Sequence, residues 1–480
     1  MLKIYNTLTK KKEEFKAIEN GKIKFYHCGP TVYWAQHIGN MRAMVLADLI
    51  RRSLNYLGYE VNFVRNYTDV GHLTSDEDTG EDKLEKGARR ENKTPQEIAE
   101  KYIKVFEDDL RDLNAQDADI KPRATEHIQE MIGMVKTLLE KGYAYATDLA
   151  IYFDVSKARD YTKLSGQILE NNISSAGKAD VEDKNKKHPA DFALWFFKAG
   201  THKNALQFWK SPFKSDLVKN GDGFPGWHIE CSAMAKKYLG DTLDLHMGGV
   251  EHIPVHHTNE IAQSESANGK KFVNYWLHNE HLNVNDGKMS KSEGAAWSLA
   301  EIKEKGYDPL ALRYFFLNSH YRSKQNFTWE ALKSAEVSLN KLRGKVIELK
   351  EGIGGQEGIE GKKSKDGEKY RNKFIAAIEY DVNIPQALAV LWEVVKADNL
   401  ENMKKLNLIF DFDKVFGLGL ENAKKEKKAE IPEEVNKIIK EREEARKKKN
   451  WKKADELRKG IEEMGFYLKD SNGESAVIKK

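Results

Sequence analysis

The 480-residue sequence predicts an α/β protein in which a doubly wound parallel sheet precedes an α-helical bundle and a small C-terminal α+β domain. Three observations predict this fold class. Residues 22–66 contain a strand, a loop, a helix and a second strand in succession, which is the βαβ unit of a parallel sheet. Helical periodicity dominates after residue 331. Asn472 and Gly473 separate two short strands near the end of the chain.

The βαβ unit indicates a Rossmann-like domain. Residues 22–26 alternate between polar and apolar side chains before a Gly-Pro turn. Residues 40–57 have apolar side chains at helical spacing, and Gly58 provides a left-handed stop. Residues 59–66 form the next strand. Because such sheets bind ligands at the carboxyl ends of their strands, we expect the chemistry in the loop of residues 28–40.

Capping and turn residues define the later elements. Thr94, Pro95 and Glu97 form a capping box that opens a helix toward Leu113. Further helices are predicted at residues 124–141, 331–351, 368–418, 432–449 and 451–464, a hairpin at 143–155, a polar surface excursion at 170–189 and a linker at 352–367. The core of the bundle is expected to include Ala376, Ala377, Ile384, Ala387, Leu388 and Leu391.

These elements divide the chain into six predicted parts. An inserted connective subdomain interrupts the parallel-sheet domain, which resumes after it. The parts are the first half of the sheet domain at residues 1–122, the insertion at 123–222, the second half at 223–285, a loop region at 286–330, the helical bundle at 331–425 and the C-terminal domain at 430–480.

The composition indicates a soluble protein. Hydrophobic residues make up 40% of the chain, charged residues 32%, and the mean hydropathy is -0.69. No apolar run spans a membrane and no hydrophobic signal core is present, so we expect a cytosolic protein without membrane association. The net charge is +4, and residues 421–480 hold 18 Lys and Arg against 14 Asp and Glu. This basic tail suits a polyanion surface or, equally, a solvated helix face.

Four side chains form a candidate metal site. Cys28 and Cys231 are the only cysteines, and at 203 positions apart they are not a disulfide framework. His256 and Glu260 lie four residues apart and would share one face of a helix. Two thiolates, an imidazole and a carboxylate suit a tetrahedral zinc ion. The spacing alone is weakly specific, because free cysteines are commonly just small buried apolar residues and the neighbouring histidines are equally compatible with surface imidazoles.

Two short motifs form a candidate nucleotide site. His37-Ile-Gly-Asn40 begins a predicted helix, where a glycine permits close approach and helix N–H groups stabilise phosphate charge. In the run Lys-Met-Ser-Lys-Ser, Lys288 and Lys291 can bring two ammonium groups to a triphosphate. HIGN differs by one letter from the HIGH signature of class I aminoacyl-tRNA synthetases, and GKMSKS contains their KMSKS signature. The two motifs, in this order, resemble that class.

Within the class, the chain resembles the cysteinyl-tRNA synthetase family. The matching stretches are FYHCGPTVY, VRNYTDV, FPGWHIECSAM, DLHMGG, HHTNEIAQSE, VNYWLHNEHL and ARKKKNWKKADELR. The resemblance covers nearly the full chain and implies ATP-dependent ligation of L-cysteine to tRNA(Cys) through a cysteinyl-adenylate. It places the zinc ligands at Cys28, Cys231, His256 and Glu260, the positions already chosen from side-chain chemistry.

A zinc ion in this family would select the substrate. Pocket size separates cysteine from serine by only about one or two orders of magnitude. Zinc binds a thiolate far better than a hydroxyl, so the metal would provide the missing discrimination. The competing interpretation, a zinc ion that activates water for hydrolysis, is disfavoured by four protein ligands. Mg²⁺ is expected to accompany ATP.

The resemblance implies further roles. Cysteine would be bound by Thr31, Trp227 and His246. ATP would be bound by His37, Gly39, Asn40, Gly249, Glu251, Lys288 and Lys291, of which His37, Asn40, Lys288 and Lys291 would be catalytic. Residues 286–330 would form the KMSKS loop and stem-contact region, 331–425 the anticodon-binding bundle and 430–480 a small tRNA-binding domain. Without the resemblance, Trp227 and Thr31 would be interpreted as a core aromatic and a turn residue.

Three departures from the family pattern bear on these expectations. Asn40 replaces the second His of HIGH and removes a positive charge, Glu251 stands where Asp is usual, and EGAAW follows KMSKS. Two alternatives therefore stay open. A tRNA-independent cysteine ligase is disfavoured by the long region after the linker. A noncatalytic zinc-dependent RNA-binding paralogue is favoured by Asn40 and disfavoured by the two lysines. For the cysteinyl-tRNA synthetase interpretation, a monomer is expected.

Overall fold

The computed structural model describes residues 1–71, 83–167, 183–284, 287–288, 297–354, 365–425, 432–448, 450–471 and 474–479, with the side chains of 287–288, 365–366 and 467–479 excepted. The chain forms two compact units, Met1–Asn422 and Ala423–Lys480. The finer division predicted within the first unit stays a prediction. No helix in these described ranges is long and apolar enough to cross a bilayer.

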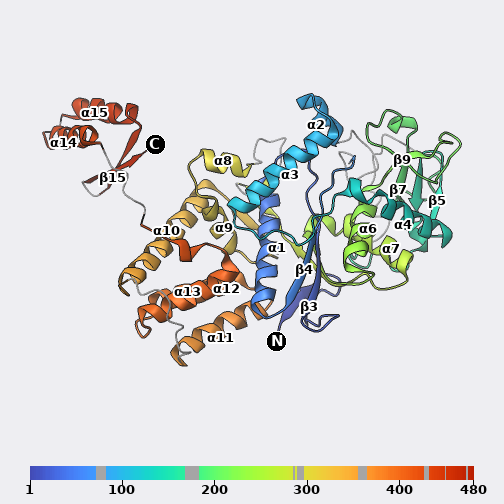
Figure 1. The fold of residues 1–480 in the computed structure, drawn as a ribbon, viewed down its shortest axis with the longest axis horizontal. Helices are drawn as coiled ribbons and strands as arrows, with labels where there is room; N and C mark the ends of the chain where they lie inside the picture. Colours follow the sequence, from blue (N-terminus) through green and yellow to red (C-terminus); the bar gives the residue numbers. More distant parts are fainter. Residues whose placement is uncertain are drawn as a thin grey trace. The chain divides into compact units, whose positions relative to one another are not determined.

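A parallel four-stranded sheet lies at the centre of the first unit, as predicted. Its strands in spatial order are β11 (Val273–Asn279), β10 (Leu243–Gly249), β3 (Lys22–His27) and β4 (Glu60–Arg65). The helix α1 (Ile38–Tyr56) lies on one side of the sheet, and α6 (Trp227–Leu239) and α7 (His256–Asn268) lie on the other (Figure 1). β10 and β11 were not predicted individually. Both are buried almost throughout, so neither strand has the exposed polar face that marks a half-buried strand.

The first βαβ unit follows its sequence closely. α1 begins two residues before the predicted start, because His37 caps it: the Nδ1 atom of His37 accepts a hydrogen bond from the Asn40 backbone N–H over 3.2 Å. The helix ends before Gly58, whose φ of +94° confirms the predicted left-handed stop. The helix α3 (Pro95–Asp112) begins with the predicted capping box of Thr94 and Glu97.

An antiparallel sheet interrupts the parallel one. Its strands in spatial order are β5 (Ala144–Ala146), β6 (Ala150–Phe153), β7 (Phe192–Phe197), β9 (Asp222–Pro225) and β8 (Trp209–Lys210). β5 and β6 are the predicted hairpin, and the helix predicted at 124–141 divides into a 3₁₀ turn and α4 (Ile128–Glu140). All six residues of β7 are apolar and buried. The strand therefore lacks the alternation of polar and apolar residues from which it could have been predicted. Most of the predicted excursion at 170–189 lies outside the described residues.

The rest of the first unit is mostly helical. Its elements include β1 (Lys3–Asn6), β2 (Lys11–Glu14), α2 (Lys83–Glu91), β12 (Leu282–Val284), β13 (Gly287–Lys288), α8 (Leu299–Glu304), α9 (Pro309–Leu317), β14 (Gln325–Phe327), α10 (Trp329–Glu351), α11 (Lys365–Glu379), α12 (Ile384–Lys396) and α13 (Asn402–Phe416). The expectation for Ala376 was wrong, because this residue lies on the exposed face of α11. Phe374 and Ile378 occupy the core instead, and the Phe374 ring stacks on Phe412 at 4.0 Å.

The second unit consists of two helices and a hairpin, as predicted. α14 (Glu433–Lys447) and α15 (Trp451–Glu463) precede β15 (Phe466–Ser471) and β16 (Glu474–Lys479), which pair antiparallel. Val435, Ile439, Ile461 and Phe466 form its apolar core. The predicted Asn-Gly turn itself lies outside the described residues.

Candidate functional site

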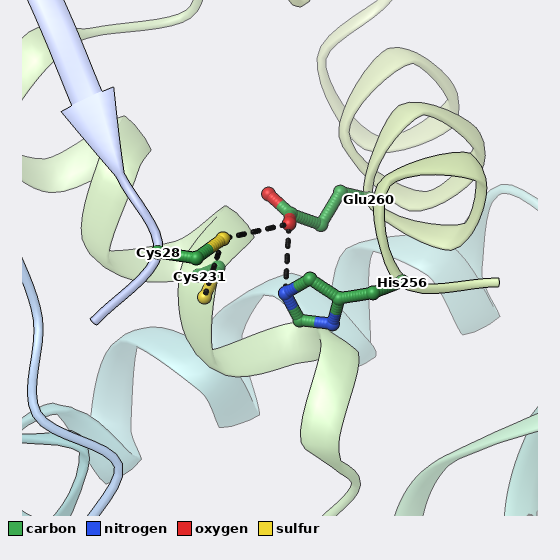
Figure 2. Close-up of side chains that lie close together, drawn as sticks. All are labelled: Cys28, Cys231, His256 and Glu260. Carbon is green, nitrogen blue, oxygen red and sulfur yellow. Dashed lines mark hydrogen bonds and ion pairs between the residues drawn. The ribbon is translucent and has the colours of Figure 1, made fainter. Parts of the chain in front are cut away.

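The four predicted metal ligands converge at the carboxyl end of the parallel sheet. Cys28 follows β3, Cys231 lies in the first half of α6, and His256 and Glu260 occupy consecutive turns of α7 (Figure 2). One ligand atom from each side chain lies within 4.8 Å of the other three. The Sγ atoms of Cys28 and Cys231 are 4.0 Å apart, and Nε2 of His256 is 2.9 Å from Oε1 of Glu260.

The donor set fits a tetrahedral zinc ion. All four side chains are buried, and Glu260 is fully inaccessible. A carboxylate and two thiols are an unfavourable group to bury together unless a cation neutralises them. Zinc is bound by thiolate, imidazole and carboxylate at about 2.0–2.3 Å, which brings ligand atoms within roughly 3–4 Å of one another. The observed separations are of this size.

The electrostatics of the cluster favour ligating protonation states at two positions. The hydrogen bond with Cys28 lowers the pKa of the Cys231 thiol to about 6, in spite of its burial. Burial opposes ionisation of Glu260, but the neighbouring imidazoles of His246 and His256 hold the pKa of its carboxyl well below the ordinary range. Burial, together with Cys231, raises the pKa of Cys28 well above its ordinary value. One thiolate and one carboxylate are therefore ready to receive a cation.

Two further histidines hold the ligands in place. Nδ1 of His228 lies 2.9 Å from Nδ1 of His256, and Nε2 of His246 lies 2.8 Å from Oε2 of Glu260. Such outer hydrogen bonds orient metal ligands and fix the tautomer of a ligating imidazole. His246 is fully buried and stacks on Trp276, so the structure places it behind Glu260 and not beside the open pocket.

A cavity of about 250 Å³ opens next to this cluster. Predicted residues from both candidate sites line it, namely Cys28, Thr31, His37, Asn40, Trp227, Cys231, Gly249, Glu251 and His256. Gly39, His246 and Glu260 do not line it. The indole of Trp227 stacks on the His256 ring at 4.7 Å, so one wall of the cavity contacts a predicted metal ligand directly. The metal cluster and the HIGN motif thus share one pocket.

The HIGN motif forms the N-terminal end of α1 beside this cavity. The Nδ2 atom of Asn40 donates a hydrogen bond to Oε1 of Gln36 over 2.6 Å. The backbone N–H of Ile38 donates to the carbonyl of Trp297 over 2.7 Å. Trp297 follows the KMSKS segment in the sequence, so this hydrogen bond joins the chain after that segment to the HIGN motif.

The two predicted lysines cannot be located in the same way. Lys288 belongs to the two-residue strand β13, and its side chain lies outside the described part of the structure. Lys291 lies outside it altogether. Their roles stay predictions.

Sequence reasoning missed several residues that line or support the pocket, among them two histidines and a glutamine. Gln36 and His27 line the cavity, and His228 supports His256. His228 could have been found from its place in the WHIEC stretch, one residue after Trp227. No pattern marks His27 or Gln36, because a single polar residue at a strand end or in a loop has no periodicity.

Comparisons with known proteins identify the family and the fold. The family model described as "tRNA synthetases class I (C) catalytic domain" matches residues 14–337. The model described as "Cysteinyl-tRNA ligase anticodon binding domain" matches residues 428–476. A solved methionyl-tRNA synthetase from Mycobacterium tuberculosis, in complex with methionyl-adenylate, shares the fold with a TM-score of 0.54 at 15% identity, over 83% of this chain and 90% of that one.

Two curated relatives extend over almost the whole chain. A cysteine–tRNA ligase from Treponema denticola is 43% identical and covers 99% of both chains. Cysteine–tRNA ligase 1 from Burkholderia lata is 42% identical, over 98% of this chain and 95% of the relative. Family models and full-length relatives therefore point the same way, and the chain belongs to the cysteine–tRNA ligase family of class I tRNA synthetases.

Proposed function

We propose that this protein activates L-cysteine with ATP and transfers it to the 3′ end of tRNA(Cys). In the first step an oxygen of the cysteine carboxylate attacks the α-phosphorus of ATP, the bond to the bridging oxygen breaks, and pyrophosphate leaves. The observation that supports this best is the single cavity lined by both the metal cluster and the HIGN residues. The thiol and the reacting carboxylate of one cysteine would fit between them.

Cys28, Cys231, His256 and Glu260 would hold one zinc ion. When bound, zinc supplies a soft Lewis acid that prefers a thiolate to a hydroxyl. The protein side chains would position the amino acid around it. Trp227, stacked on His256, and Thr31 would line the pocket for cysteine, and His246 would act from behind through Glu260.

The N-terminal end of α1 would receive the phosphates of ATP. Helix N–H groups and the His37 imidazole present donors there, and Asn40 adds an amide in place of a cationic ring. Gly39 would let adenine approach, and Gly249 and Glu251 would lie beside the ribose. Lys288, Lys291 and Mg²⁺ would neutralise charge on the pentavalent phosphate.

Exchange of labelled pyrophosphate into ATP tests the activation step. We expect exchange with cysteine and less than about 1% of that rate with serine. Equal exchange with serine would refute selection by zinc. Aminoacylation of tRNA(Cys) then separates a tRNA ligase from a ligase that passes cysteine to another amine.

Zinc content tests the metal assignment. The purified protein should contain one zinc ion per chain, and Cys231→Ser should lose most of it because a hydroxyl is a poor zinc ligand. Lys237→Ser, on the exposed face of the same helix, is the matched control and should keep the metal. Equal zinc in both variants would contradict the assignment.

A noncatalytic RNA-binding role is the second candidate, and Asn40 is the observation that favours it. It predicts zinc and tRNA binding without any cysteine-dependent exchange. We also propose that the protein is a cytosolic monomer that does not associate with membranes. Sedimentation of the purified chain checks its oligomeric state.

A further inference from the structure

His27 is the last residue of β3, and it lines the cavity although the proposed function gives it no role. Only 1% of the residue is exposed. Neither Nδ1 nor Nε2 has a hydrogen-bond partner among the described residues. Buried polar groups in folded proteins are almost always hydrogen-bonded, so an imidazole with two unpaired nitrogens beside a cavity indicates a bound group.

The pleat of β3 decides which half of the cavity this side chain serves. Successive residues of a strand point to opposite faces of the sheet. Tyr26 packs against His246, and Cys28 enters the metal cluster, so both point toward α6 and α7. His27 points to the other face, where its ring lies 6.4 Å from the ring of Phe63.

The same face carries the helix of the HIGN motif. Arg51, in the middle of α1, lies over the Phe63 ring at 5.4 Å, so α1 covers the face to which His27 points. Ala43 and Met44, in the first turns of α1, line the cavity together with His27. His27 therefore belongs to the nucleotide half of the pocket, and the metal cluster lies on the opposite face of the same strand.

The hydrogen-bonding groups of the His27 imidazole indicate which part of the nucleotide it would bind. A neutral imidazole offers one donor and one acceptor. A phosphate oxyanion only accepts, so it would leave the acceptor nitrogen unpaired, whereas a ribose hydroxyl or the edge of adenine can satisfy both kinds of group. We propose that His27 binds the adenosine half of ATP. This inference rests on the proposed function, because it requires ATP in this cavity.

Binding of ATP alone, measured by calorimetry on the full-length zinc-loaded chain, tests the inference directly. His27→Phe keeps a ring and removes both nitrogens, and we expect it to weaken ATP binding at least about tenfold, the loss of roughly one good hydrogen bond. In cysteine-dependent exchange, KM for ATP should rise in proportion, while KM for cysteine and zinc content stay within about twofold. His27→Gln, which retains a donor and an acceptor, should recover part of the affinity.

His202→Phe is the matched control. This imidazole packs against Phe196 and Phe224 outside the cavity, so its replacement should leave ATP binding unchanged. If His27→Phe binds ATP as tightly as the unchanged protein, an ordered water satisfies the ring and the inference is wrong. If the unchanged protein binds ATP but shows no cysteine-dependent exchange, the proposed function fails while the calorimetric comparison still decides the role of His27.

Discussion

The side chain of Asn40 is held by a neighbour in the preceding loop. The Nε2 atom of Gln36 donates to the carbonyl oxygens of Thr31 and Trp34, over 3.3 and 3.2 Å, so its Oε1 atom must face the Asn40 amide. Gln36 is only 7% exposed. One of the two N–H groups of the Asn40 side-chain amide is used in this contact. The contact also fixes the direction of the second N–H group. The neutral residue at the end of HIGN is therefore oriented, although it has no charge.

Removing this contact should slow activation. Gln36→Met keeps the length of the side chain and loses its hydrogen bonds, so we expect kcat for cysteine-dependent exchange to fall about tenfold with little change in KM for cysteine. In a double-mutant cycle with Asn40→Ala, the two losses should not add, because Gln36→Met acts through the Asn40 amide and Asn40→Ala removes that amide. Additive losses would show that Gln36 acts on the loop alone. Gln96→Met, on the exposed face of α3, is the control.

Gly29 is a second residue whose identity is dictated by its surroundings. A Cβ atom at this position would lie 1.6 Å from the carbonyl oxygen of Asn66, so the backbone would have to move. Because Gly29 is adjacent to Cys28, we expect Gly29→Ala to destabilise the fold by about 2 kcal/mol or more and to reduce zinc content. Urea unfolding and metal analysis measure the two effects.

Gly133→Ala provides the contrast for that prediction. Gly133 lies on the exposed side of α4, and nothing lies within 4 Å of an added Cβ. Helix propensity should then stabilise the protein by about 0.5–1 kcal/mol. A similar loss in both variants would mean that crowding against Asn66 is not the cause.

Residue chemistry predicted the metal cluster better than it predicted the rest of the pocket. Thiolates, an imidazole and a carboxylate are rare enough together that their types alone indicated a metal, and the structure brings those four together. His246 lies behind Glu260, which the sequence could not indicate because it does not reveal which way β10 faces, and its role toward cysteine stays a prediction. His27 and Gln36 depend on contacts across strands and loops that no local pattern records.

At the scale of elements, capped helices were predictable and buried strands were not. The capping box of α3 and the Gly58 stop are local chemistry, and both are where the sequence placed them. β7 has six buried residues in a row, and such a run is equally compatible with a buried helix segment. Tertiary pairing, which the sequence does not show directly, decides between the two.

The helix α3 contains a carboxyl group that should make stability depend on pH. Burial, with the nearby charge of Asp112, raises the pKa of Asp109 to about 7. The folded state therefore favours the protonated acid, and stability falls as the pH rises from about 4 to about 7, where the unfolded chain has already lost the proton. Asp109→Asn should stabilise the protein by about 2 kcal/mol at pH 8 and by little at pH 4.

Urea unfolding at the two pH values checks this prediction. Asp108→Asn is the matched control, since Asp108 is half exposed and pairs with Arg111 at 2.7 Å. It should show no such gain at pH 8. An equal effect of Asp109→Asn at both pH values would mean that the substitution acts through packing and not through charge.

At the scale of the whole molecule, the chain divides into two compact units, and the second coincides with the matched anticodon-binding family model. A chain that ends at Asn422 should retain cysteine-dependent exchange within about twofold, because the pocket lies in the first unit. Its kcat/KM for tRNA(Cys) should fall by about tenfold or more, and the salt dependence of that value should become weaker as phosphate contacts are lost. If the truncated chain aminoacylates tRNA(Cys) as well as the full-length chain, the second unit has no role in tRNA recognition.

The order of domains was therefore easier to predict than their boundaries. Changes in periodicity and a Gly and Lys rich stretch marked the helical region and the tail, and the two-helix, two-strand tail is confirmed. The first 422 residues nevertheless form one compact unit, in which the helical bundle packs against the sheet domain. The buried Arg313 of α9, for example, donates to Asp48 in α1 and to the carbonyl of Phe416 in α13.

The alternation at the end of β3 has a consequence for engineering and for evolutionary drift. Tyr26, His27 and Cys28 point to opposite faces in turn, so neighbouring positions of one strand can be substituted with separate effects on the two halves of the pocket. A single-residue insertion or deletion in this strand would instead exchange the two faces at once. The end of β3 should therefore tolerate substitutions but not insertions or deletions.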